Sequence, residues 1–275
     1  MQPHAIHNQT TTLTPLYPFD WQTPETARLR SAANQLTSIT LEEMDSVKLM
    51  NRIDRKYTLN KLALPEILDK VRDEYRILVV EGYRLNDYRT VYFDTEEFEL
   101  YARHVTKRKN RYKVRQREYL SSNQVFLEIK QKTNNGHTIK TRVEANHFTE
   151  IFDRQKEIGV SLADEWMQLE AKLWNNFTRI TLVSRTNQER VTIDTDITVS
   201  SPNGYRSLGN IAVAEIKTSS AGTHSRITEI LKSRRYHAQS FSKYAVGVAL
   251  LYDNVKKNSM KPILLGLEKI MERNL

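Results

Sequence analysis

Apolar residues recur every three to four positions in several segments of the chain, which is the spacing of an amphipathic helix. This spacing begins at Pro24. The run Thr40-Leu41-Glu42-Glu43 then has the form of a capping box that opens a helix running towards Met50. Another helix is predicted over residues 60–74. Its apolar residues share one side: Leu62, Leu64, Ile67, Leu68 and Val71.

Strands are predicted through most of the remaining chain, where β-branched and aromatic residues alternate with polar ones. They cover residues 52–58, 76–80, 89–94, 110–119, 124–132, 138–145, 178–185, 190–199 and 211–217. Turns are expected at Asn134-Asn135-Gly136 and at Ser201-Pro202-Asn203-Gly204. Helical spacing returns over residues 96–104, 147–174, 223–235, 241–251 and within 256–275.

The order of these elements predicts the fold class. Strands follow one another in runs instead of alternating with helices, which disfavours a doubly wound parallel sheet. The pattern favours an α+β fold on a large antiparallel sheet or barrel. Residues 1–40 are expected to form an N-terminal arm, partly disordered, because residues 1–23 are rich in Thr, Gln, Asn and Pro. A main domain is expected over 41–255 and a C-terminal helix over 256–275.

The segment 107–119 has the most informative pattern. Arg111, Lys113, Arg115 and Arg117 are two residues apart, so a strand places all four on one face. No acid lies between them on that face. Taken alone, the segment fits equally well an ordinary solvated edge strand, in which cationic side chains discourage aggregation.

Four further strands carry charged residues that alternate with apolar ones. The charged faces hold Glu128, Lys130 and Lys132; Lys140, Arg142 and Glu144; Arg190, Thr192 and Asp194; and Glu215 and Lys217. Rows of like charge repel one another unless an anion lies between them. We therefore expect these faces to line the inside of a closed sheet that holds a chain of phosphates. Helices at 60–74, 147–174 and 223–251 are expected to cover the outer apolar faces.

Acids stand at selected places within the basic rows. Glu128, Glu144, Asp194 and Glu215 could form internal ion pairs or supply oxygen ligands to Mg²⁺ or Mn²⁺. An ion pair is the simpler interpretation of any one acid. For Glu215, which lies in a strand of small and apolar residues, metal binding is the favoured interpretation.

The composition agrees with an anionic partner. The 275 residues include 42 Lys and Arg against 33 Asp and Glu, a formal charge of +9, and 39% are hydrophobic, which suffices for a core. The absence of cysteine excludes disulfides, thiolate metal sites and a cysteine nucleophile. No segment has the ~20 apolar residues of a membrane helix and the N-terminus lacks a secretory signal, so a cytoplasmic location is expected.

Nine short motifs occur in an order similar to that of a known family. They are RIDRKY (52–57), TVYFDT (90–95), YARH (101–104), KVRQREY (113–119), FLEIK (126–130), IKTRVE (139–144), RVTID (190–194), AEIK (214–217) and FSKY (241–244). Over about residues 45–252 the chain resembles the VTC domain, the polyphosphate polymerase branch of the triphosphate tunnel metalloenzymes. The resemblance implies an antiparallel eight-stranded β-tunnel or barrel with a basic interior, covered by helices.

The resemblance also implies roles for single residues. Arg115 and Arg117 match an Arg-x-Arg pair that grips phosphates, and Glu215 matches the metal-binding glutamate. Expected catalytic residues are Arg115, Arg117, Lys130 and Lys243. Substrate binding is expected from Arg52, Lys56, Lys113, Lys140, Arg142, Lys217 and a later arginine that the spacing leaves open between Arg185 and Arg190. Glu128 and Glu144 are further candidate metal ligands.

The implied reaction makes inorganic polyphosphate from the γ-phosphate of ATP, with Mn²⁺ or Mg²⁺ as cofactor. Related hydrolases and cyclases carry Glu-x-Glu-x-Lys on the first strand. Here the same positions are Arg52, Asp54 and Lys56, which argues against a simple two-metal triphosphatase.

Two alternatives stay open: a tripolyphosphate or nucleoside triphosphate hydrolase of the same fold, and a polyphosphate-binding module without turnover. A nucleic-acid or lipid binder that used 107–117 would leave the other four charged strands unexplained, so no nucleic-acid partner is expected. A membrane-protein partner is left open.

Overall fold

The computed structural model describes residues 23–45, 53–135, 137–149, 169–220 and 222–272. These ranges contain eight long strands and three short ones. The long strands are β2 (Ile53–Asn60), β4 (Asn86–Asp94), β5 (Arg111–Tyr119), β6 (Gln124–Lys132), β7 (Thr138–Ala145), β8 (Glu170–Ser184), β9 (Glu189–Ser201) and β11 (Ile211–Thr218). The short strands are β1 (Thr37–Ile39), β3 (Tyr75–Leu78) and β10 (Gly204–Ser207).

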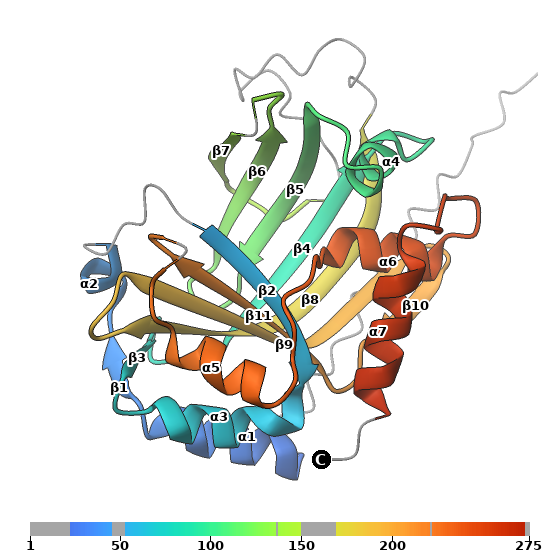
Figure 1. Ribbon diagram of the computed structural model, residues 1–275. Coiled ribbons are helices and arrows are strands. Elements are labelled where there is room, and N and C mark those ends of the chain that lie inside the picture. The colour runs from blue at the N-terminus through green and yellow to red at the C-terminus, as the bar shows by residue number, and fades with distance from the viewer. Residues whose placement is uncertain (1–22, 46–52, 136, 150–168, 221, 273–275) are drawn as a thin grey trace, which may run out of the picture.

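All of these strands belong to one strongly curved sheet (Figure 1). The long strands follow one another in the order β2-β11-β9-β8-β4-β5-β6-β7, and every neighbouring pair is antiparallel. The short strands extend the sheet, with β1 parallel to β3. The predicted α+β fold with eight antiparallel strands is therefore confirmed.

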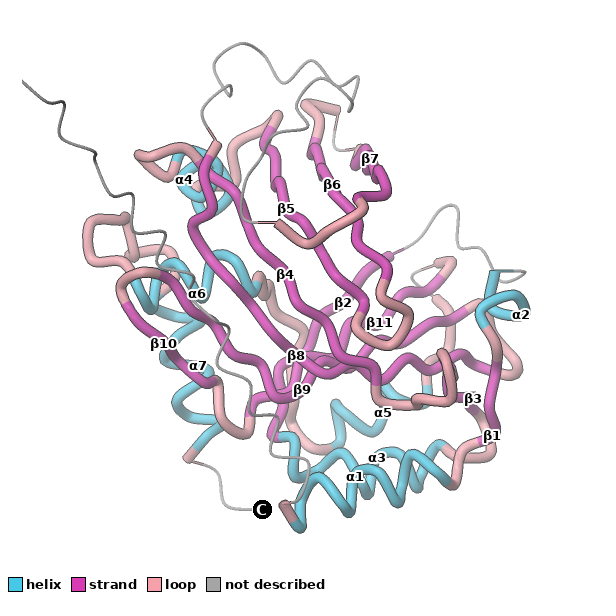
Figure 2. Tube along the Cα trace, turned by 180° about the vertical axis from the view of Figure 1, so that it is seen from behind, coloured by secondary structure: helices cyan, strands magenta, loops and turns pink. Residues whose placement is uncertain are grey.

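Three helices cover the outer face of β2, β9 and β11. They are α1 (Pro24–Asn34), α3 (Leu64–Val71), which follows a 3-10 turn at Lys61–Ala63, and α5 (Arg226–Ser233). Figures 1 and 2 show them together along one side of the sheet. One buried cluster joins these helices to the strands, among them Leu29, Ile67, Leu68, Ile227, Leu231, Tyr57, Ala214 and Ile216. Part of the predicted N-terminal arm thus packs into the core through α1.

The predicted capping box is confirmed. The backbone N–H of Thr40 donates to Glu43 Oε2 at 2.9 Å, and the Glu43 N–H donates to Thr40 Oγ1 at 3.3 Å. These bonds open α2 (Leu41–Asp45). The expected continuation towards Met50 lies outside the described residues.

The helix predicted over 147–174 is wrong at its end. Residues 170–174 belong to β8, while 150–168 lie outside the described residues. Leu169 and Leu173 are four residues apart, a spacing that fits a helix as well as a strand. The pairing of residues 170–174 with β4, which β9 joins at Trp174, decides in favour of the strand, because it satisfies backbone hydrogen bonds.

The place of α6 (Lys243–Leu251) corrects a second expectation. It lies on the concave face of the sheet instead of the outer one: Tyr244 and Val248 share a buried cluster with Leu173 and Phe177, which lie on the same face as the β5 cations. Most of α6 is apolar on all sides, and α7 (Lys261–Met271) contributes to the same buried cluster and contacts β2 and β11. Of the segment 223–251, only α5 covers an outer face.

Buried Asp94 joins this helix to the sheet. It accepts the backbone N–H groups of Leu100 and Tyr101, both at 2.8 Å, at the start of α4 (Glu99–Val105). The hydroxyl of Tyr244 on α6 donates to the same carboxylate. One side chain at the end of β4 therefore fixes the positions of α4 and α6.

None of the described helices combines the length and the apolar character needed to cross a bilayer.

The close packing of α6 predicts the effect of adding one methyl group at Gly247. A Cβ at this position would lie 2.6 Å from Leu173 Cδ2 and 3.0 Å from Val199 Cγ1. Although alanine favours a helix, we expect Gly247→Ala to lower the free energy of unfolding by about 1–2 kcal/mol, because the core is overpacked. Urea unfolding measures this.

Gly266 on α7 is the matched control, since a Cβ there meets only Gln239 Oε1 at 3.9 Å. Gly266→Ala should leave the stability unchanged or raise it by up to about 1 kcal/mol. Equal stabilisation by both substitutions would contradict the packing of α6 on the concave face.

Candidate functional site

Cross-strand rows of charge line the concave face of β5, β6 and β7. In register, Lys113 lies opposite Lys130 and Arg115 opposite Glu128. The rows continue on β7, which places Lys140 beside Lys130 and Arg142 beside Glu128. Arg111 and Lys132 form the next row. The predicted alternation of these strands is thus confirmed as a continuous charged surface.

A second charged group occupies the other end of the sheet. Glu215 on β11 lies opposite Lys56 on β2, and Lys217 lies between Arg190 on β9 and Asp54 on β2. Glu215 Oε2 is 3.0 Å from Lys217 Nζ, and its Oε1 is 3.7 Å from Lys56 Nζ. Burial alone would raise the pKa of Glu215, but the two ammonium groups lower it to about 2.

The curvature of the sheet brings these two groups within electrostatic range of each other. Burial lowers the pKa of Lys113, and the charges of Lys56 and Lys130 lower it further. The pKa of Lys130 is likewise lowered by burial and then by Lys56. Cations from β2, β5 and β6 therefore repel one another across the concave space, and an anion between them would relieve that repulsion.

Glu128 is the counter-ion of the β5–β7 rows. Its side chain is 2% exposed, and its Oε2 accepts from Arg115 Nε at 2.8 Å and Nη2 at 2.6 Å. Lys140 Nζ lies 2.5 Å from Oε1, with Arg142 Nε at 3.8 Å. Burial opposes ionisation, but the cations, Arg115 foremost, hold the pKa of this carboxyl well below its usual range. With both oxygens occupied, Glu128 fits an ion pair better than a metal ligand.

Asp194 on β9 is a second internal counter-ion, and it reveals a residue that the sequence did not single out. Arg179 on β8 donates from Nε and Nη2 to the two carboxylate oxygens at 2.6 and 2.9 Å. The ammonium of Lys243 contacts the same carboxylate. Arg179 was missed because the residues two positions away on either side, Phe177 and Thr181, carry no charge. Its place on the same face as Asp194 follows only from the β8–β9 register.

The segment 241–243, at the start of α6, connects the charged walls. Lys56 Nζ donates to the carbonyl of Phe241 at 3.0 Å, and Lys113 Nζ donates to Ser242 Oγ at 3.0 Å. Burial lowers the pKa of Lys243 to about 7, although Asp194 opposes this shift. The predicted catalytic lysine thus lies among the cations of the concave face.

Aromatic rings support several of the cations. The guanidinium carbons of Arg117 and Arg179 lie 5.1–5.5 Å from the ring centres of Tyr88 and Phe177. Arg142 lies 3.4 Å from the ring centre of Phe126. Such contacts hold cationic groups in place without neutralising their charge.

The remaining expected site residues are the two candidate later arginines, the acid on β7 and the arginine before β2. Arg190 lies on the concave face, whereas Arg185 follows the end of β8, is exposed, and donates its backbone N–H to Glu74 O at 2.9 Å. This placement favours Arg190 as the later arginine. Glu144 is exposed on β7, on the same face as Arg142. Arg52 lies outside the described residues.

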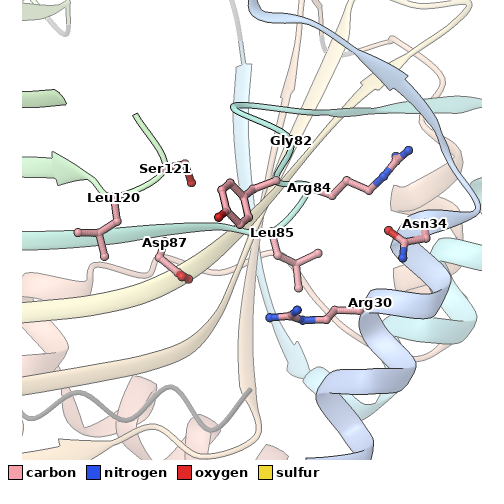
Figure 3. Close-up of a pocket in the computed structure, with 9 residues that line it drawn as sticks. Arg30, Asn34, Gly82, Arg84, Leu85, Asp87, Leu120 and Ser121 are labelled. Carbon is pink, nitrogen blue, oxygen red and sulfur yellow. The ribbon is translucent and has the colours of Figure 1, made fainter. Parts of the chain in front are cut away.

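A pocket of about 510 Å³ lies away from these rows, between α1 and the start of β4 (Figure 3). Arg30, Tyr83 and Asp87 are among its lining residues. Asp87 alternates with Tyr88 along β4 and so faces away from the concave side. Burial raises the pKa of Asp87 to about 6. The pocket is therefore separate from the charged site.

The described residues contain no group of three or more His, Cys, Asp or Glu side chains that could hold a metal ion by themselves. Mg²⁺ and similar ions are often bound by one or two carboxylates, with water and substrate phosphates completing the coordination. Glu215, 23% exposed on the concave face, fits such a shared ion. Glu128 and Asp194 fit it less well, because they are only 2% and 6% exposed and their ion pairs with Arg115 and Arg179 are closer, at 2.6 Å.

The curved antiparallel sheet with a cationic concave face agrees with the tunnel-like fold that the motifs predict. The chain belongs to the VTC domain family, whose model matches residues 51–252. The resemblance in the motifs is thereby confirmed, and membership supports phosphoryl chemistry on polyphosphate or triphosphate substrates.

Solved structures with a similar arrangement are distant in sequence. A putative adenylyl cyclase from Hippeastrum, described as having a dominant triphosphatase activity, is 16% identical, with 71% of this chain and 94% of that chain covered and a TM-score of 0.42. A putative adenylate cyclase from Vibrio parahaemolyticus is 12% identical over 72% and 99% of the two chains, with a TM-score of 0.41. For an RNA triphosphatase from S. pombe the identity is 10%, the coverage 87% and 93%, and the TM-score 0.27. No curated protein matches the chain.

The counter-ion role of Glu128 predicts a loss of stability in Glu128→Gln. Removing the charge leaves Arg115 and Lys140 facing each other unpaired, so we expect a loss of about 1–3 kcal/mol at pH 7, less than for a fully buried pair. The folded-state pKa of Glu128 is lowered, so its contribution is present above the ordinary carboxyl pKa and is lost as the pH falls below it. Urea unfolding at pH 7 and pH 3.5 tests this.

The control is Glu144→Gln, an exposed acid on the adjacent strand, which should change the stability by less than about 0.5 kcal/mol. A difference between wild type and Glu128→Gln that grows on acidification would contradict the assigned role.

Proposed function

We propose that this chain makes inorganic polyphosphate by transferring the γ-phosphoryl group of ATP to the end of a phosphate chain held on the concave face. The observation that carries the proposal is the placement of Lys113 directly opposite Lys130, with Lys56 of a third strand within electrostatic range of both. Isolated surface cations would avoid one another. A polyanion that spans the concave space gives each of them a partner.

The arginines suit the grip on the phosphates. Arg115 and Arg117 project from the same face of β5, and Arg179 lies near them above the same aromatic rings as Arg117. A planar guanidinium can hold two oxygens of one phosphate, which orients the group as well as neutralising it. Arg115 is bound to Glu128 in the absence of ligand, so a phosphate would compete with this carboxylate for it.

The reaction is an exchange of phosphorus–oxygen bonds. A terminal oxygen of the acceptor chain forms a bond to the γ-phosphorus of ATP, the bond to the β–γ bridging oxygen breaks, and ADP leaves with that electron pair. Positioning and charge stabilisation supply most of the catalysis of such transfers, and no covalent nucleophile is required. Lys243, beside Asp194 and Arg179, is placed to neutralise charge on the leaving or attacking oxygen.

A divalent metal ion bound at Glu215 would draw negative charge from the phosphates that it coordinates. Lys56 and Lys217 hold the Glu215 carboxylate ionised, as a metal ligand must be. The same two lysines would be released to the phosphates when the carboxylate turns to the metal.

The product distinguishes synthesis from hydrolysis. Purified protein incubated with ATP and Mn²⁺ should yield ADP and long polyphosphate, resolved by gel electrophoresis. Free phosphate without polymer would assign the chain to the hydrolases of this fold. If the protein binds a non-hydrolysable nucleotide but forms no product from ATP, the chain is a binding module without turnover.

Replacing Arg115 and Arg117 together by Gln should abolish synthesis. Each guanidinium contributes charge-assisted hydrogen bonds of about 1.5–3 kcal/mol, so we expect polymer formation to fall by roughly 10²–10⁴-fold. The initial rate of polymer formation at saturating ATP measures this. Arg206→Gln, an exposed arginine on β10, is the control and should be fully active. Near-normal synthesis by the double variant would refute the proposed binding of phosphate by Arg115 and Arg117.

Glu215→Gln should change the response to metal. Losing the Glu215 carboxylate should raise the Mn²⁺ concentration required for half-maximal activity by about tenfold or more. Electron paramagnetic resonance of Mn²⁺ with tripolyphosphate would show the weakened binding directly. Glu170→Gln, an exposed acid at the start of β8, serves as the control. An unchanged Mn²⁺ dependence means that the metal is held elsewhere.

A further inference from the structure

His104 occupies a position that the proposed reaction does not explain. It lies in the last turn of α4, whose start is fixed to β4 and α6 by the buried Asp94 carboxylate. Its ring is half-buried. The position of the imidazole is therefore set by the Asp94 carboxylate, which also fixes the start of α6, where Lys243 lies. It does not depend on a surface loop.

The ring contains a polar atom with no partner. His104 Nδ1 is buried and makes no hydrogen bond with any described residue. Leaving a buried donor or acceptor unpaired costs about 1–3 kcal/mol, and such groups in native proteins call for an explanation. A ligand that supplies the missing partner is one explanation.

The charges that act on the ring are those of the proposed site. They belong to Lys113 and Arg111 on β5, Lys56 on β2 and Lys130 on β6. The acids that act on Lys130 in this group are Glu215, which is paired with Lys56 and Lys217, and Asp54. Burial first, and then the four cations, lower the pKa of His104 to about 2. The imidazole is therefore neutral throughout the physiological range.

We infer that His104 is a phosphate-binding residue whose neutral Nδ1–H donates a hydrogen bond to an oxygen of the chain held by Lys113 and Lys130. The inference rests on the proposed phosphate site and adds a residue to it. A neutral imidazole carries one N–H, and the tautomer with hydrogen on Nδ1 is selected when an acceptor lies there. A neutral donor adds a contact to the phosphate without adding to the repulsion among the cations.

Three substitutions separate this role from packing. The side-chain amide of Asn places an N–H near the position of His Nδ1, that of Gln places one near Nε2, and Phe keeps the ring but no donor. Isothermal titration of each variant with tripolyphosphate gives the affinities. We expect His104→Asn to bind within about threefold of wild type. His104→Gln and His104→Phe should bind about tenfold more weakly or worse, since a hydrogen bond to a charged acceptor is lost.

Thermal unfolding of each variant shows whether it is folded, and histidine ¹⁵N spectra of the wild type give a second measurement. With tripolyphosphate bound, the His104 resonances should show a neutral ring with hydrogen on Nδ1. Four results would each overturn the inference. The affinity for tripolyphosphate could be equal in all four proteins, or equally reduced in all three variants. The Gln variant could retain the affinity while the Asn variant loses it, or the ring could be protonated at neutral pH.

These outcomes are independent of turnover. If the wild type binds tripolyphosphate but makes no polymer, the proposed synthesis fails and the role of His104 is still decided by the titrations. If the wild type makes polymer and all variants bind tripolyphosphate equally, only the inference about His104 fails. No binding by the wild type would overturn both.

Discussion

Repulsion among cations on a shared concave face is the constraint on which this structure depends. Lys56, Lys113 and Lys130 disfavour one another's charge from three strands, and burial adds to the cost. The fold tolerates this because Glu128, Asp194 and Glu215 each lie between two or more cations. These internal acids hold the charged strands together.

The start of α6 places part of the machinery inside this field. Segment 241–243 accepts hydrogen bonds from Lys56 and Lys113 and brings Lys243 to Asp194. Tyr244, one residue further on, is anchored to Asp94 at the end of β4. The apolar helix α6 therefore has two roles on the concave face. It packs against the uncharged part of the sheet, and its first residue, Lys243, adds a cation to the charged part.

The period of two along β5, β6, β7, β9 and β11 made the charged face and the α+β fold predictable, because side-chain direction in a strand follows from position alone. The sequence could not give the cross-strand register, and so could not show that Glu128 is enclosed by Arg115 and Lys140, or that Arg179 meets Asp194. The position of α6 was also inaccessible, since an apolar helix fits either face of a sheet. The prediction of where β8 begins failed because the spacing of Leu169 and Leu173 fits both a helix and a strand.

The central claim is that one chain of phosphates occupies the whole concave face, and calorimetric titration of wild-type protein with phosphate, pyrophosphate and tripolyphosphate at several salt concentrations tests it most directly. The account predicts that the affinity rises steeply with each added phosphate and falls steeply with salt, because a longer chain meets more cations and displaces more counterions. Equal affinity for all three anions, or binding indifferent to salt, would contradict it.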